Sequence, residues 1–225
     1  TVTDTSATAA ALTTLDGKTT VAVTASAVTS LSGTATEVKA AYTADAAGTL
    51  VLDNDEAVSV SGSVSVADAN IIAGKTSGVV TATIATGSYT ELNALNETSN
   101  AYALTLNETL TVAEADALDA KTTGVVTATL STGDIATLAG LNGTGNAYTV
   151  TVTDTSATAA ALTTLDGKTT VAVQAGNVTS ISGTATEVKA AYTADANGTI
   201  VLDGDEAVSV SGSVSVADAK IIAGK

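Results

Sequence analysis

The sequence predicts a repeat solenoid, in which strand-plus-helix coils stack with a parallel sheet on one side and short helices on the other. Two observations carry this prediction. Residues 1–75 and 151–225 differ at only eight of their 75 positions. Within each block, short β-branched runs of alternating polarity precede segments whose apolar residues lie three or four apart. Such a coil cannot bury its apolar face alone, so neighbouring coils must cover one another. A right-handed parallel β-helix is the alternative architecture.

The domain organisation follows the repeat. Residues 1–225 are expected to form one continuous array of three blocks, 1–75, 76–150 and 151–225. The middle block carries a shorter period, because the segments that start at Val64 and Val79 recur 46 residues later. Sequence of the same kind continues after residue 75 and stands before residue 151. We therefore expect the chain to be a section of a longer array with a 150-residue super-repeat.

The strands are predicted from the alternating runs. These runs are residues 20–24, 28–33, 57–66, 102–106, 126–130 and 148–152. Because successive side chains of a strand point to opposite faces, alternation divides the runs into two sets. Leu104, Leu106, Val126, Ala128, Leu130, Val150 and Val152 are expected inside, and the threonines between them outside.

The helices are predicted from their starts and ends. Thr34 with Glu37, Ser88 with Glu91, and Thr111 with Glu114 each match the capping box. Gly-Lys or Ala-Lys closes many of the same segments, which is typical of a helix end. Nine strand-plus-helix units, three in each block, follow from this pattern.

Composition excludes several classes of chemistry. The net charge is −15, the eight cations are all lysines, and His, Cys, Met, Phe, Trp and Pro are absent. Without His or Cys there is no imidazole base, thiol nucleophile, disulfide or usual zinc site. Without Arg or stacking aromatics we expect no nucleic-acid partner. No apolar run reaches about 18 residues, so no membrane span is expected.

The string Gly-Lys-Thr occurs at Gly17, Gly74 and Gly167 and superficially suggests a phosphate loop. The full motif needs another glycine five residues earlier, where Leu12, Ala69 and Leu162 stand. The string also follows a predicted helix, whereas a phosphate loop precedes one. We interpret it as a helix end, and no catalytic residue is predicted elsewhere.

Two acidic turns are the candidate metal sites. The strings Leu-Asp-Asn-Asp-Glu-Ala and Leu-Asp-Gly-Asp-Glu-Ala place carboxylates at alternate positions, which suits Ca²⁺. The predicted ligands are Asp53, Asp55, Glu56, Asp203, Asp205 and Glu206. The EF-hand pattern fails at the next alternate position, and the glycine-rich nonapeptide of calcium β-rolls is missing. The alternative interpretation is a solvated acidic turn between two strands.

Outward threonines form a second candidate surface. Thr-x-Thr at Thr81, Thr127 and Thr149 would stack into a ladder of methyl and hydroxyl groups, an arrangement similar to that of ice-binding solenoids. Alanines such as Ala103 interrupt the ladder, and threonine is also simply a favourable exposed strand residue.

The repeated strings TGVVTATLSTGDIATLAGL and VTDTSATAAALTTLDGKTT resemble repeats of very large secreted bacterial proteins, above all cyanobacterial cell-surface and haemolysin-like adhesins. This resemblance covers the whole chain and implies an extracellular or cell-surface location with a structural or adhesive role. The repeat itself favours the same role, because near-identical copies keep an array uniform. We expect a structural section of a fibre, surface layer or adhesin stalk, with further copies of itself as partner. A calcium-binding module and an ice-binding solenoid are the alternatives.

Overall fold

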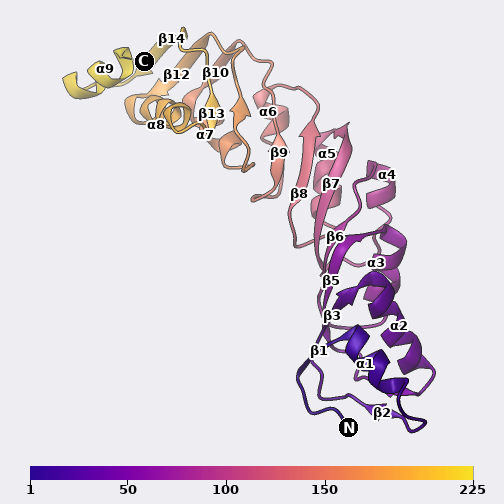
Figure 1. The fold of residues 1–225 in the computed structure, drawn as a ribbon. Coiled ribbons are helices and arrows are strands. Elements are labelled where there is room, and N and C mark those ends of the chain that lie inside the picture. Colours follow the sequence, from indigo (N-terminus) through magenta and orange to yellow (C-terminus); the bar gives the residue numbers. More distant parts are fainter. Residues whose placement is uncertain (225) are drawn as a thin grey trace. The chain divides into compact units, whose positions relative to one another are not determined.

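The computed structural model describes residues 1–224 and shows an α/β protein whose paired strands run parallel (Figure 1). The described part contains nine helices, three in each 75-residue block, as the sequence predicts. The chain forms two compact units: Thr1–Thr105 with Leu118–Val125, and Leu106–Ala117 with Val126–Lys225.

The helices are short, as expected for coils of about 25 residues. They are α1 (Ala9–Asp16), α2 (Ala35–Ala46), α3 (Val66–Ala73), α4 (Tyr89–Leu92), α5 (Val112–Asp119), α6 (Ile135–Leu138), α7 (Ala159–Asp166), α8 (Ala185–Ala196) and α9 (Val216–Ala223).

Most strands have two to five residues, and two are longer. They are β1 (Ser6–Thr8), β2 (Val23–Thr24), β3 (Ser30–Thr34), β4 (Leu50–Val51), β5 (Ala57–Val64), β6 (Val80–Ile84), β7 (Ala101–Leu110), β8 (Val126–Leu130), β9 (Ala147–Thr149), β10 (Ser156–Thr158), β11 (Val173–Gln174), β12 (Ser180–Thr184), β13 (Ile200–Val201) and β14 (Ala207–Ser211).

In the first unit, β1, β3, β5, β6 and the start of β7 are successive neighbours, and β2 pairs with β4. The register between β5 and β6 places apolar residues opposite one another, as in the pair Val58 and Val80. Helices α1, α2 and α3 lie on one side of these strands (Figure 1). Parallel neighbours need a connection that crosses back over the sheet, and the helices provide it.

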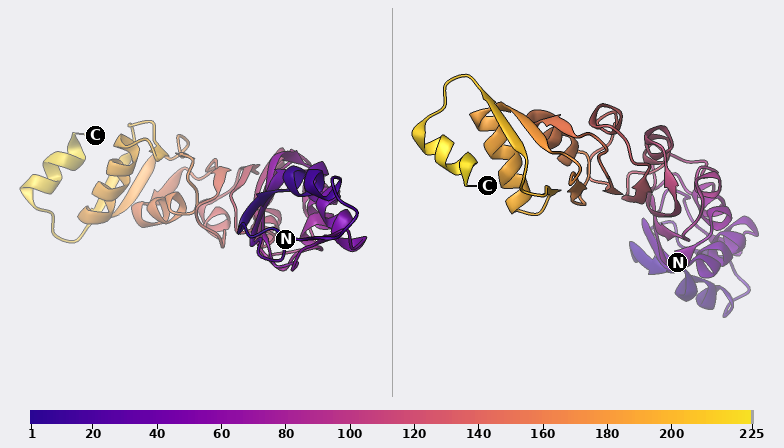
Figure 2. Two further views of the ribbon diagram at one scale, coloured as in Figure 1. Left: turned by 60° about the horizontal axis from the view of Figure 1, so that its bottom comes forward. Right: turned by 90° about the horizontal axis from the view of Figure 1, so that it is seen from above.

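In the second unit, β8 pairs with β9, β10 pairs with β12, β12 pairs with β14, and β11 pairs with β13. Helix α7 packs on β10 and β12, α8 packs on β12, and α9 packs beside α8 (Figure 2). The third block thus repeats the pairing of the first, as its near-identical sequence predicts.

Alternation along the strands predicts the core correctly, with one exception. Six of the seven residues expected inside are at most 5% exposed. Leu106 is only half-buried, so this prediction is wrong for that residue. The intervening threonines are exposed apart from the half-buried Thr151.

The predicted helix starts are confirmed. Thr34 and Ser88 accept hydrogen bonds from the backbone N–H three residues on, and Glu37 and Glu91 accept from the cap residues in return. Thr111 and Glu114 make the same reciprocal pair. These bonds satisfy N–H groups that the first helical turn leaves without partners.

The Gly-Lys-Thr strings follow helices, as predicted. Gly17, Gly74 and Gly167 are the C-cap residues of α1, α3 and α7. A right-handed parallel β-helix is built from strands and would not contain these helices, so that alternative architecture is wrong. No helix in residues 1–224 has the length and apolar character needed to span a membrane.

Candidate coil-docking interface

Threonines join successive coils by bonding to the backbone of the preceding one. The Thr76 hydroxyl donates to the Glu56 carbonyl at 2.7 Å, and Thr122 and Thr169 donate to the carbonyls of Tyr102 and Tyr148 at 2.8 and 2.6 Å. Each hydroxyl oxygen also accepts the N–H two residues further along. The threonine after Gly-Lys or Ala-Lys is therefore a structural link between coils.

Two glycines allow the backbones to approach at these junctions. A Cβ on Gly78 would lie 2.3 Å from the Glu56 carbonyl oxygen, and one on Gly124 would lie 2.3 Å from that of Tyr102. Both distances are far below van der Waals contact. Any side chain there would push the coils apart.

Buried asparagines provide a third contact of the same kind. The Oδ1 atoms of Asn100 and Asn146 accept hydrogen bonds from the backbone N–H groups of Val80 and Val126, at 2.7 and 2.8 Å. A buried N–H must find a partner, and here a side chain supplies it at the edge of the strand ladder.

The helices make a matching contact on their own side. Asn70 on α3 donates from Nδ2 to the Ala94 carbonyl and accepts at Oδ1 from the N–H of Asn96, at 2.9 and 3.0 Å. Asp116 on α5, 46 residues later, accepts from the N–H and Nδ2 of Asn142 at 2.9 and 2.8 Å. One helix position therefore recognises the turn of the following coil.

The first acidic turn lies between β4 and β5, in agreement with the interpretation of this segment as a turn between two strands. Asp53 and Asp55 are exposed, but the Glu56 side chain is fully buried. Its Oε1 accepts the N–H groups of Asp53 and Asn54, both at 3.1 Å, and its Oε2 accepts the Tyr42 hydroxyl at 3.1 Å. The carboxylate of Glu56 therefore holds its own turn.

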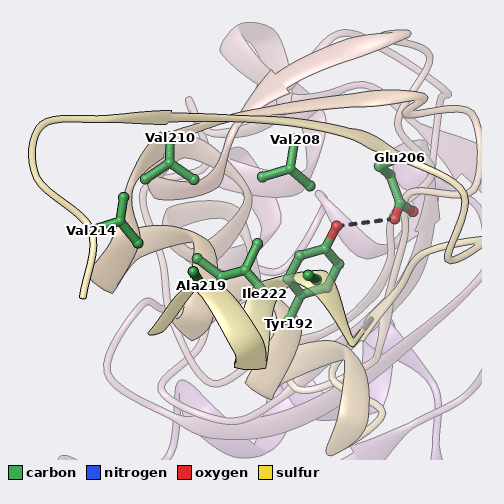
Figure 3. A pocket seen from close by; sticks show the side chains of 8 residues that line it. Tyr192, Glu206, Val208, Val210, Val214, Ala219 and Ile222 are labelled. Carbon is green, nitrogen blue, oxygen red and sulfur yellow. Dashed lines mark hydrogen bonds between the residues drawn. The ribbon is translucent and has the colours of Figure 1, made fainter. Parts of the chain in front are cut away.

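The second acidic turn repeats this geometry. Glu206 accepts the N–H groups of Asp203 and Gly204 at 3.1 Å and the Tyr192 hydroxyl at 3.4 Å (Figure 3). Asp203 and Asp205 are exposed and Glu206 is half-buried.

The structure does not bring these carboxylates together as a metal cluster. Throughout residues 1–224, no three acidic side chains are grouped so that they would share an ion. The physical reason is that Glu56 and Glu206 turn inward to bond the backbone while the aspartates face solvent. The calcium site stays a prediction.

The tyrosines beside the two turns are held in their neutral form. Burial, and then the negative charge of Glu56, raises the pKa of the Tyr42 hydroxyl far above its ordinary value of 10.0. Burial and Glu206 likewise raise the pKa of Tyr192. Both hydroxyls are therefore donors to a carboxylate and not candidate bases.

The outward threonines form an interrupted ladder. Thr81 and Thr83 lie opposite Ala101 and Ala103 on the next strand. Thr129 lies opposite Thr149, but Thr127 lies opposite an alanine. The ice-binding surface stays a prediction.

An apolar groove of about 430 Å³ lies between β14 and α9 (Figure 3). It is lined by Tyr192, Glu206, Val208, Val210, Val214, Ala219, Ile222 and Ala223. We refer to the surface formed by Val208, Val210, Val214, Ala219 and Ile222 as the β14–α9 face.

Sequence reasoning missed the junction residues, although the repeat contains a signal for them. Thr76 and Gly78 recur as Thr122 and Gly124 at the 46-residue offset, and Asn100 recurs as Asn146. Position 70 has a different signal in the sequence. It is one of the eight positions at which residues 1–75 and 151–225 differ.

No protein-family model matches this sequence, and neither the curated proteins nor the solved structures include a match. The functional interpretation therefore rests on the contacts described above.

Proposed function

We propose that the chain is a β/α solenoid section that serves a structural, non-catalytic role in an extracellular fibre, surface layer or adhesin stalk. Its partner is more of the same coil, either along one chain or from another copy. The observation that carries this proposal is that two kinds of side-chain-to-backbone contact, one from threonine and one from asparagine, recur along the chain.

These contacts suit a stack because they depend little on which coil comes next. Thr76, Thr122 and Thr169 all bond to a main-chain carbonyl, a group that every residue offers. Repeat arrays draw their stability from such nearest-neighbour interfaces. Further coils extend the array without requiring a new kind of contact.

The composition supports the same role. A charge of −15 keeps a long array soluble and limits lateral association. The absence of Cys and Met removes the side chains that oxidise most readily, which suits a long-lived extracellular protein.

A length measurement tests the proposal. In a tandem variant, residues 76–225 are repeated once more after Lys225, which adds six strand-plus-helix units. Electron microscopy is expected to show particles of unchanged width that are longer by about 29 Å, at roughly 4.8 Å for each added strand. Compact particles that widen in all directions would contradict a stack.

A further inference from the structure

Identical sequences are buried to different extents in the two near-identical copies. Residues 57–64 and 207–214 have the same sequence. Val64 is 1% exposed, whereas Val214 is 38% exposed. Ala69 is buried and Ala219 is exposed, and β5 continues for eight residues where β14 has five. Since sequence does not differ here, a missing neighbour accounts for the difference.

The neighbour is visible in the first copy. Strand β6 pairs with β5, so that Val80 lies opposite Val58 and Ile84 lies opposite Val64. Thr76 and Asn96 add the side-chain contacts to Glu56 and Asn70. Residues 76–100 thus supply the strand, the helix and the turn that cover this face.

We propose that the β14–α9 face is a docking site for a coil with the sequence pattern of residues 76–100. This inference rests on the proposed function and names the surface and the partner through which the stack adds a coil. The mode of binding is strand addition, in which a sheet edge gives main-chain hydrogen bonds and the apolar face gives specificity.

Lys220 adjusts which coil the face accepts. It stands where Asn70 bonds to both the carbonyl of residue 94 and the N–H of residue 96. A lysine donates but does not accept, so it replaces only the first of these bonds. At the equivalent α5 junction the Asn142 side chain bonds to Asp116, so position 220 faces a side chain of the partner turn. Lys220 therefore favours an aspartate at position 96 of the incoming coil.

A peptide-binding experiment tests the face. The probe is a fluorescently labelled synthetic peptide of residues 76–100, titrated with the full chain and followed by anisotropy. Saturable binding with a dissociation constant of about 100 µM is expected, because the free peptide must order as it binds. No saturation up to about 1 mM would overturn the proposal.

Two variants distinguish docking on the β14–α9 face from non-specific binding. Val214→Asp places a charge in the face and is expected to weaken binding about tenfold or more. Ile221→Asp on α9 is the matched control, because it introduces the same charge outside the β14–α9 face. Ile221 is 50% exposed and its counterpart Ile71 is 49% exposed, so residues 76–100 do not cover this position in the first copy. Equal losses in both variants would overturn the proposal.

Position 220 is tested by a double-mutant cycle. Lys220→Asn makes α9 identical to α3 and is expected to bind the unchanged peptide about fivefold more tightly, by one recovered hydrogen bond. The Asn96→Asp peptide is expected to prefer the natural Lys220 chain by a similar factor. Absence of coupling between the two positions would contradict the assigned alignment.

Hydrogen exchange provides a site-specific measurement, which non-specific binding of the peptide would not change. Bound peptide is expected to slow exchange at residues 212–214, which become strand as in the first copy. Proteolytic fragments that include Lys220 or Asn70 distinguish the two copies. Binding is measured on single chains, so its failure refutes the docking face even if the tandem variant lengthens. Conversely, compact tandem particles refute the stack even if the peptide binds.

Discussion

Single side chains that bond to a neighbouring backbone set how closely the coils approach. Thr76 and Gly78 meet the backbone of Glu56 in the preceding coil, and Asn100 bonds to the backbone of Val80 at the next junction. Threonine is the smallest side chain that carries both a hydroxyl and a β-branch, and glycine leaves room for a carbonyl.

Gly78→Ala is expected to destabilise the chain by about 3 kcal/mol, because the new Cβ overlaps the Glu56 carbonyl oxygen and nothing flexible is available to move. Urea unfolding followed by circular dichroism measures this change. Gly17→Ala is the control, since its Cβ would meet its nearest neighbour at 3.5 Å and the backbone there is already helical. Equal stability of the two variants would show that the junction is not closely packed.

Tyr102 and Tyr148 occupy equivalent positions but bond differently. The Tyr102 hydroxyl is buried and has no hydrogen-bond partner among residues 1–224, whereas that of Tyr148 donates to the Ala115 carbonyl at 3.4 Å. Burial and then the charge of Glu97 raise the pKa of Tyr102 to about 12.

Tyr102→Phe is therefore expected to be neutral or stabilising by up to about 1 kcal/mol, because it removes an unsatisfied buried hydroxyl. Tyr148→Phe is expected to cost about 1 kcal/mol. Midpoints of urea unfolding compare the pair, and a larger loss in the Tyr102 variant would reveal a partner for that hydroxyl.

One difference between the copies is explained at this scale. Asn54 and Gly204 occupy the same turn with φ of 59° and 79°. Glycine and asparagine are the residues that adopt this left-handed conformation most readily, so the exchange preserves the turn.

At the scale of elements, the starts of α2, α4, α5 and α8 share an electrostatic feature. Backbone hydrogen bonds from Thr34, Ser88, Thr111 and Thr184 lower the pKa values of Glu37, Glu91, Glu114 and Glu187. The carboxylate form is the better acceptor for the exposed N–H groups of the first turn.

These shifts fix the sign of a pH dependence. A lowered pKa in the folded chain gives stability that is complete above the unfolded value of 4.5 and is lost as the pH falls through the folded value. Glu37→Gln is expected to be less stable than the natural chain at neutral pH, and the difference is expected to vanish in acid. Thermal melts across the acid range measure it. A difference that persists at about pH 3 would show that charge is not its cause.

Helix pairs are also joined by lysine–aspartate contacts. Lys39 bonds to Asp68 between α2 and α3, and Lys189 bonds to Asp218 between α8 and α9. The hydrogen bond from each lysine is the main cause that lowers the pKa of its aspartate. All four side chains remain about one-third exposed, so solvent screens both pairs and each contributes little to stability.

At the scale of the whole molecule, like charges repel along the chain. With 23 acidic residues and eight lysines, added salt is expected to raise the melting temperature by screening this repulsion. The effect is expected to be general, because Glu56 is the only acidic residue in residues 1–224 that is fully buried.

Calcium is tested in the same measurement. We expect CaCl₂ and MgCl₂ of equal concentration to raise the melting temperature equally, because Glu56 and Glu206 already bond to their own turns. A shift specific to Ca²⁺ that disappears in the Asp53→Asn, Asp55→Asn variant would establish the calcium site at the first turn.

Local structure was predictable because its causes are local. The capping box at Thr34 and Glu37 involves residues three apart, and the alternation that buries Val126, Ala128 and Leu130 follows from strand geometry alone. The exception at Leu106 and the inward turn of Glu56 depend on what lies beside them, which no local pattern reports.

The sequence by itself determined that strands and helices alternate, the number of helices in each block and the starts of α2, α4 and α5. Only the tertiary structure decided which coils are covered and which carboxylates are available. The clearest case is Val64 and Val214, which have the same sequence on both sides and different exposure. Burial belongs to a residue together with its neighbours, and one strand of a stack acquires its inner face only when the next strand is laid upon it.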